Sequence, residues 1–232
     1  DTARFRPDIL TAAEREAGRA RYGIARDRKV IIYLGLLAPH QGTGVLLDSI
    51  QRVLAREPRA FFLIGGFPGN ELYRLHAERL GLGAATSFPG CIPYESAAEF
   101  LALGDLAVGP KLSQTEGNGK LYNYSAMGLP TVAFDTPANR EILGNDGLYA
   151  PLGNADALAD GLLHLLAHPA EAAARGRALR QRAVRQLSWD ARIDDLLRVY
   201  SRLLAAPVSG ASPTPTSKRY ARSTHTTGEG DD

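Results

Sequence analysis

The chain has 232 residues, of which 44% are hydrophobic and 22% are charged, a composition typical of a globular protein with one sizeable core. Its single cysteine, Cys91, excludes an internal disulfide framework and a zinc site with four thiolate ligands. The net charge of +2 is too small to indicate nucleic-acid binding, and no apolar run approaches the roughly 20 residues of a membrane-spanning helix. We therefore expect neither a nucleic-acid partner nor a transmembrane segment.

Short apolar runs alternate with helical periodicity along most of the chain. Before the first run, Thr11-x-x-Glu14 predicts a capping box at the start of a helix. Each run is too short for a helix and is bounded by turn residues, as expected for strands that are buried on both faces. The predicted strands are Val30–Leu34, Ala60–Ile64, Thr86–Phe88, Leu106–Gly109, Thr131–Phe134 and Leu148–Ala150.

Amphipathic helices are predicted between and after these strands. Asn70 is expected to cap the helix that Gly81 ends, and Ser96 and Glu99 form a second predicted capping box. This alternation predicts the fold class, an α/β Rossmann-like doubly wound parallel sheet, in which ligands bind at the carboxyl ends of the strands. The predicted helices include Gly44–Arg56, Asn70–Leu80, Ala155–Ala167, Pro169–Gln186 and Asp190–Leu204.

The loop after the fourth predicted strand carries the strongest chemical signal. Gly117 and Gly119 let the backbone approach a ligand closely, and the helix that follows directs free N–H groups at it. Lys120 lies in the first turn of that helix, where a cation opposes the helix dipole unless an anion binds there. A diphosphate fits this pattern, and a flexible surface turn with a solvated lysine is the alternative that spacing leaves open.

The same loop resembles the donor-site motif of glycosyltransferase family 4. Residues 116–130 read EGNGKLYNYSAMGLP, against EGxPNKLxEYMAxGLP in the family. Three more segments are similar in the same order: YLGLLAPHQG at 33–42 to YVGRLxxxKG, IGGFP at 64–68 to VGxGP, and FPGCIP at 88–93 to FxGxVP. The resemblance implies the C-terminal, nucleotide-sugar-binding half of a GT-B fold that transfers a sugar with retention of anomeric configuration.

The resemblance also implies a role for each matching residue. Glu116 is expected to face the donor sugar as the catalytic residue, and Cys91 and Ile92 to border the base. Leu121 is expected near the ribose, and no cofactor or bound metal is implied. The implied donor-binding residues are Gly35, Gln41, Gly65, Cys91, Ile92, Gly117, Asn118, Gly119, Lys120, Leu121 and Asn123.

The chain departs from the family pattern at three places. Leu36 and Gln41 occupy positions where the family offers an arginine and a lysine to the diphosphate. Asn123 replaces the glutamate that binds the ribose hydroxyls. Glu116 lies one residue closer to this position than is usual, so either a tighter turn keeps its role or Thr115 has taken it. The candidates to replace the lost cations are Lys111, Lys120 and Arg140.

The domain organisation follows from the same comparison. Residues 1–7 resemble the linker that enters the C-terminal domain, so 1–29 are expected to form an interdomain linker and first helix, and 30–205 the donor-binding domain. The Ser/Thr/Pro/Gly-rich residues 206–232 are expected to be a disordered tail. The partner that this organisation lacks is an N-terminal acceptor-binding domain, without which part of the last helix should be exposed, at Ile193, Leu196, Leu197 and Tyr200.

The predicted function is therefore the donor-binding half of a bacterial glycosyltransferase that uses a nucleotide-diphosphate sugar, located in the cytoplasm or at the inner face of the membrane. Leu36 and Gln41 favour a different hypothesis, a non-catalytic binding or interaction module of the same fold. A sugar-nucleotide epimerase of this overall fold is a third reading that spacing does not separate from the first.

Overall fold

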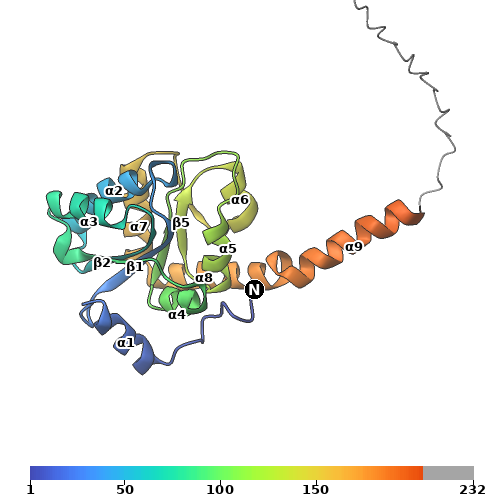
Figure 1. The fold of residues 1–232 in the computed structure, drawn as a ribbon, viewed down its shortest axis with the longest axis horizontal. Coiled ribbons are helices and arrows are strands. Elements are labelled where there is room, and N and C mark those ends of the chain that lie inside the picture. Colours follow the sequence, from blue (N-terminus) through green and yellow to red (C-terminus); the bar gives the residue numbers. More distant parts are fainter. Residues whose placement is uncertain (206–232) are drawn as a thin grey trace, which may run out of the picture. The chain divides into compact units, whose positions relative to one another are not determined.

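In the computed structural model, which describes residues 1–205, six parallel strands form one sheet in the order β3-β2-β1-β4-β5-β6 (Figure 1). The predicted doubly wound α/β sheet is confirmed. Asp1–Asp195 form one compact unit that contains the sheet, and a second unit begins at Leu196. The predicted tail, 206–232, lies outside the described residues.

All six predicted strands are present, and the last three have the predicted bounds. The first three run further. The glycines near the ends of β1 and β2 allow these strands to stay paired up to the partners Leu36 and Phe67, and β3 continues to Gly90. The strands are β1 (Lys29–Leu36), β2 (Ala60–Phe67), β3 (Thr86–Gly90), β4 (Leu106–Gly109), β5 (Thr131–Phe134) and β6 (Leu148–Ala150).

The helices cover the strands in the expected places. A π-helical turn, Ala183–Leu187, ends the predicted helix that began at Pro169. The α-helices are α1 (Ala12–Arg21), α2 (Thr43–Arg56), α3 (Asn70–Arg79), α4 (Ala97–Ala102), α5 (Gly119–Ala126), α6 (Pro137–Leu143), α7 (Ala155–Ala167), α8 (Pro169–Arg182) and α9 (Trp189–Ala205).

One of the two predicted capping boxes is confirmed. At α1, the Glu14 amide donates to Thr11 Oγ1 at 3.3 Å, and the Thr11 amide donates to Glu14 Oε2 at 2.8 Å. The box at Ser96 is wrong, because this residue ends a 3-10 turn in a right-handed helical conformation and so lacks the extended backbone of a cap. Asn70 is also not a cap; it is the first residue of α3, and its side chain donates to the Phe88 carbonyl.

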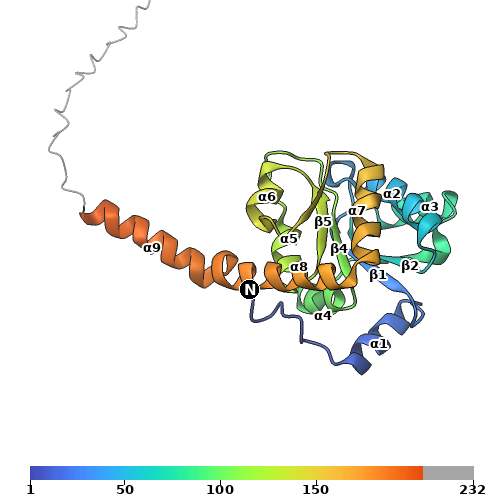
Figure 2. The same cartoon turned by 180° about the vertical axis from the view of Figure 1, so that it is seen from behind.

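The hydrophobic core has two layers, one on each face of the sheet. Ile31 and Tyr33 of β1 pack with the buried residues of α2, α3 and α7, whereas Val30 and Ile32 pack with those of α4, α5, α6 and α8. Both views show α5 and α6 across the strands from α2 and α3 (Figures 1 and 2). Successive strand residues point to opposite faces, so a strand buried on both sides needs the continuous apolar run found in the sequence.

The first residues of the chain are part of this core. Phe5 is fully buried in the layer that contains α4, α5, α6 and α8. Arg180 of α8 donates to the carbonyl oxygens of Thr2, Phe5 and Ala126 at 2.7 to 3.0 Å. The segment predicted to be a linker is thus attached to α8 and to the end of α5.

The apolar residues expected to be exposed on α9 are exposed. Ile193, Leu196, Leu197 and Tyr200 retain between 50% and 55% of their accessible surface. Within residues 1–205, no helix combines the length and apolar character needed to cross a membrane.

The close pairing of β1 with β2 depends on Gly66, and this gives a first prediction. A Cβ atom at this position would lie 1.9 Å from the carbonyl oxygen of Gly35, so Gly66→Ala must separate the two strands. We expect a loss of about 3 kcal/mol or more in the free energy of unfolding, measured by urea denaturation. Gly44→Ala is the control, because nothing lies within 4 Å of its Cβ position and its stability should be unchanged or higher. Equal stability of the two variants would contradict the prediction.

Candidate functional site at the carboxyl ends of β1 and β4

Two loops meet at the carboxyl ends of β1 and β4, the neighbouring strands between which the strand order of the sheet reverses. One follows β1 and the other follows β4, and they are joined by a hydrogen bond from the Leu112 amide to the His40 carbonyl at 3.1 Å. Gly42 has a positive φ of 75°, and a Cβ atom there would lie 1.8 Å from the Pro110 carbonyl oxygen. The loops therefore approach as closely as backbone allows, at the switch point where ligands bind in open α/β sheets.

Lys120, in the first turn of α5, lies at the centre of this region. The buried Tyr124 hydroxyl accepts a hydrogen bond from the Leu34 amide at 2.9 Å, which fixes α5 against β1. This brings the Lys120 side chain across Gly35, where a Cβ atom would lie 2.6 Å from Lys120 Cε. The ammonium group also lies 5.3 Å from the centre of the Tyr33 ring. With glycine at position 35 the Lys120 side chain can cross β1 in this position, which a side chain there would displace.

The hydrogen-bond partners of the Lys120 ammonium within residues 1–205 are neutral amides. Nζ donates to Gln41 Oε1 at 2.8 Å and to Asn118 Oδ1 at 3.1 Å. Burial, together with repulsion from Lys111, lowers the pKa of Lys120 to about 8. A cation at the amino end of a helix, beside a second cation and without a carboxylate partner, makes this region attractive to an anion.

Lys111 holds the glycine-rich loop in place. Its largely buried ammonium donates to the Gly117 carbonyl at 2.9 Å and lies 2.9 Å from Glu116 Oε2. The hydrogen bond from Lys111 lowers the pKa of Glu116, whose side chain is otherwise exposed. Glu116 is therefore ionised at neutral pH and is directed to the Lys111 side of the loop.

A buried amide pair fixes the start of α5. Asn118 Nδ2 donates to Asn139 Oδ1 at 3.1 Å, and Asn139 Nδ2 donates to the Phe134 carbonyl at 2.8 Å. Both residues are almost fully buried. The chain of bonds from β5 through α6 orients the amide of Asn118, whose oxygen then faces Lys120. Asn139 is a site residue that was not predicted, because nothing in the sequence around it marks a buried amide.

The predicted site residues fall into two groups. Gly35, Gln41, Asn118 and Lys120 are in direct contact at the ends of β1 and the start of α5. Glu116 and Gly117 join them through Lys111, and nothing lies within 4 Å of a Cβ atom built on Gly117 or Gly119, which leaves space for a ligand.

The remaining predicted residues lie outside this contact group. Gly65 is a packing position, because a Cβ atom there would lie 2.8 to 2.9 Å from Phe100 and Ile92. Cys91 is exposed in the loop after β3. Leu121 is fully buried, with Cδ2 against Gly109, and so belongs to the core as well as to the start of α5. The side chain of Asn123 is partly buried on α5. The assigned contacts with base and ribose stay predictions.

Of the three side chains that could replace the arginine and lysine of the family pattern, two lie at the candidate site. Lys111 and Lys120 both face the loop after β4, whereas Arg140 pairs with Asp135 at 2.7 Å and stacks over the Tyr149 ring at 4.4 Å. Leu36 is 43% exposed at the end of β1 and offers no charge. Among residues 1–205, no cluster of three or more His, Cys, Asp or Glu side chains is arranged to hold a metal ion.

The chain has relatives among curated glycosyltransferases. The chain is 32% identical over 209 residues to a GDP-mannose-dependent alpha-(1-6)-phosphatidylinositol monomannoside mannosyltransferase of Mycolicibacterium smegmatis. The matched segment covers 85% of this chain and 54% of that protein. The chain thus spans about half the length of the curated relatives it matches.

Solved structures show the same fold. The crystal structure of Anabaena HepE in complex with UDP-glucose is similar with a TM-score of 0.76 and 17% identity, over 87% of this chain and 55% of that one. The C-terminal domain of a glycosyl transferase group 1 family protein from Francisella tularensis matches with a TM-score of 0.68 and 18% identity, over 82% of this chain and 98% of that one. These structures confirm the Rossmann-like half of a GT-B fold.

Residues 28–168, which contain the whole sheet and both loops of the candidate site, match the family described as glycosyl transferases group 1. The chain belongs to this family of glycosyltransferases.

Proposed function

We propose that this chain is the donor-binding half of a retaining glycosyltransferase, and that the carboxyl ends of β1 and β4 bind the diphosphate of a nucleotide sugar. The observation that carries the proposal is the Lys120 ammonium, which lies at the amino end of α5 with two amide oxygens as partners. A diphosphate would supply the negative charge that this environment lacks. Its oxygens would also accept hydrogen bonds from the free N–H groups of the first helical turn.

The relatives support the class of donor. One similar enzyme is named as dependent on GDP-mannose, and one similar structure contains UDP-glucose. The match to nearly the whole of a separately solved C-terminal domain supports the assignment of this chain to that half. The acceptor-binding half is the partner that this proposal requires.

The described residues would contribute to the reaction mainly through electrostatics. When the bond between the anomeric carbon and the diphosphate oxygen breaks, negative charge accumulates on the diphosphate leaving group. Lys120 and the amides at the start of α5 are placed to stabilise that charge without reorganising. Glu116 is ionised and can accept hydrogen bonds from sugar hydroxyls, while Lys111 restrains its loop. We propose that no cofactor or bound metal is needed.

Loss of the Lys120 charge should weaken nucleotide binding. A charge-assisted hydrogen bond is worth about 1.5–3 kcal/mol, so Lys120→Ala should raise the dissociation constant of the preferred nucleoside diphosphate by about 10- to 150-fold. Isothermal titration of UDP, GDP and ADP measures this and identifies the base. Arg79→Ala is the control, because it removes an exposed cation of α3. Equal affinities of the wild type, Lys120→Ala and Glu116→Ala would contradict the site.

Nucleotide affinity should fall at mildly alkaline pH. The pKa of Lys120 is about 8 in the free protein, so below pH 8 the ammonium is charged and ready to pair with the diphosphate. Above pH 8 binding must be accompanied by uptake of a proton, and affinity declines until the higher pKa of the bound state is reached. The diphosphate itself is already ionised in this range. The decline should be absent in Lys120→Met; a decline of equal size in this variant would assign it to another group.

The second candidate function is a binding module that has lost its donor, and Leu36 is the feature that favours it. Leu36→Arg separates the two hypotheses more cleanly than a change at Gln41, because a lysine at 41 would place a second ammonium against Lys120. If the site has lost its donor through the change at position 36, Leu36→Arg should raise affinity by about tenfold or more, measured by titration with the same nucleotides. An unchanged affinity in a variant of wild-type stability would show that the phosphates are held elsewhere.

A further inference from the structure

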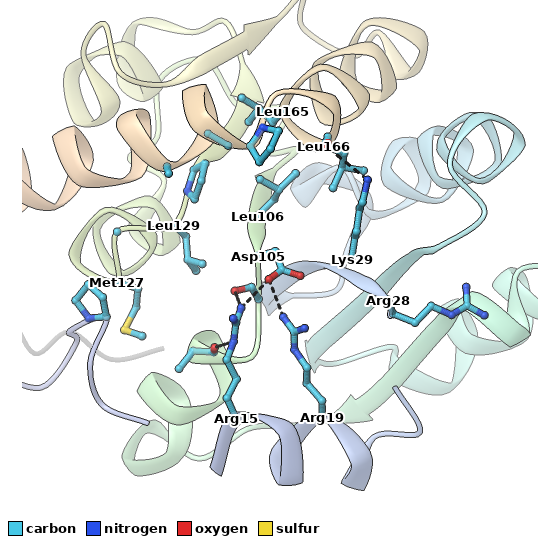
Figure 3. Close-up of a pocket in the computed structure, with 18 of the residues that line it drawn as sticks. Arg15, Arg19, Arg28, Lys29, Asp105, Leu106, Met127, Leu129, Leu165 and Leu166 are labelled. Atoms are coloured by element: carbon cyan, nitrogen blue, oxygen red, sulfur yellow. Dashed lines mark hydrogen bonds and ion pairs between the residues drawn. The ribbon is translucent and has the colours of Figure 1, made fainter. Parts of the chain in front are cut away.

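A cavity opens at the amino ends of the strands (Figure 3), at the other end of β1 and β4 from the candidate donor site. Its volume is about 670 Å³, within the range of pockets that bind small molecules. It is bounded by α1, by the starts of β1 and β4, by the turn between α5 and β5, and by α7 and α8. Every residue that lines it belongs to the compact unit Asp1–Asp195.

One wall of this cavity is aliphatic. Leu106 at the start of β4, Leu129 before β5 and Leu165 on α7 line it together with Leu166 and Met127. Figure 3 shows Leu106, Leu129 and Leu165 around the same open space. These residues come from three separate parts of the chain, and the fold brings them together to form the apolar wall of one cavity.

The facing wall carries an excess of positive charge. Arg15 and Arg19 of α1 both pair with one oxygen of Asp105, Oδ1, at 2.8 and 2.9 Å. The other oxygen, Oδ2, accepts the Val30 amide at 2.7 Å. Two guanidinium groups thus share one carboxylate, and the nearby Lys29 in turn shares Glu57 with Arg59, at 2.6 and 3.2 Å. The cationic side chains on this side of the cavity, Arg15, Arg19, Arg28 and Lys29, therefore outnumber the carboxylates that pair with them among the described residues.

Both arginines retain donors for a ligand. In the described residues, their bonds to Asp105 and to the carbonyls of Ala102, Leu103 and Gly104 run through Nε and Nη2. A guanidinium group has five N–H donors in a fixed fork, so the Nη1 amino group of each arginine is left over. Figure 3 shows both side chains rising from α1 toward Asp105, while Arg28 points away.

We propose that this cavity binds an amphipathic anion, a carboxylate or phosphate headgroup on a single aliphatic chain. The headgroup accepts hydrogen bonds from Arg15 and Arg19 and balances the charge that Asp105 leaves over. The aliphatic chain lies along Leu106, Leu129 and Leu165. The site is separate from the proposed donor site and does not depend on it.

The ligand class is tested by isothermal titration of the whole chain, at concentrations below micelle formation. The ligands are octanoate, octyl phosphate, octyltrimethylammonium, acetate and inorganic phosphate. The proposal predicts binding of the octyl anions, with at least about tenfold weaker binding of the cation and of the two short anions. The stronger of octanoate and octyl phosphate identifies the headgroup. Equal binding of octyltrimethylammonium would show a merely apolar surface and overturn the proposal, as would no binding of either octyl anion.

The location is tested by a matched pair of substitutions on α8. Ala173 is exposed and lines the cavity, whereas its neighbour Ala174 is exposed and does not. Ala173→Trp should fill the cavity and weaken octyl-anion binding by about tenfold or more, and Ala174→Trp should leave it unchanged. Nucleotide affinity should be the same in both variants, which shows that the fold is intact. Equal octyl-anion affinity of Ala173→Trp and Ala174→Trp would exclude this cavity as the site.

Discussion

The carboxyl end of the sheet depends on how a lysine is accommodated at the start of α5. Lys120 crosses β1 at Gly35, and β1 in turn approaches β2 so closely that Gly66 has no room for a side chain. The buried amides of Asn118 and Asn139 then fix the end of the helix from which the lysine extends. These contacts hold the Lys120 ammonium in a defined place before any ligand binds.

The secondary structure could be predicted well because the sheet is buried on both faces. Strands such as Leu106–Gly109 and Thr131–Phe134 are short apolar runs between turn residues, and their ends are visible in the sequence. The caps were harder to predict, because they depend on backbone conformation. Ser96 has the residue type of a cap, but the 3-10 turn before it leaves the residue in the wrong conformation.

The candidate site was predicted in part. The glycine-rich loop and Lys120 are visible in the sequence, because glycines, a lysine and a helix start lie within a few residues. Gln41 was predicted as a donor-binding residue that departs from the family pattern, and the structure shows it as a direct partner of Lys120. Asn139 could not be found, because its burial and its bond to Asn118 depend on how α6 packs against α5. Sequence spacing carries no information on such pairs.

The attachment of the first residues to α8 extends the compact unit beyond the segment that matches the family. The family match starts at residue 28, yet Phe5 lies in the core and Arg180 donates hydrogen bonds to the carbonyl oxygens of Thr2 and Phe5. A polypeptide cut at the family boundary would lose a buried aromatic ring and leave that guanidinium group with two fewer acceptors. The compact unit Asp1–Asp195 is therefore longer than the segment that matches the family, and recombination between relatives should succeed only at junctions that keep these first residues together with α8.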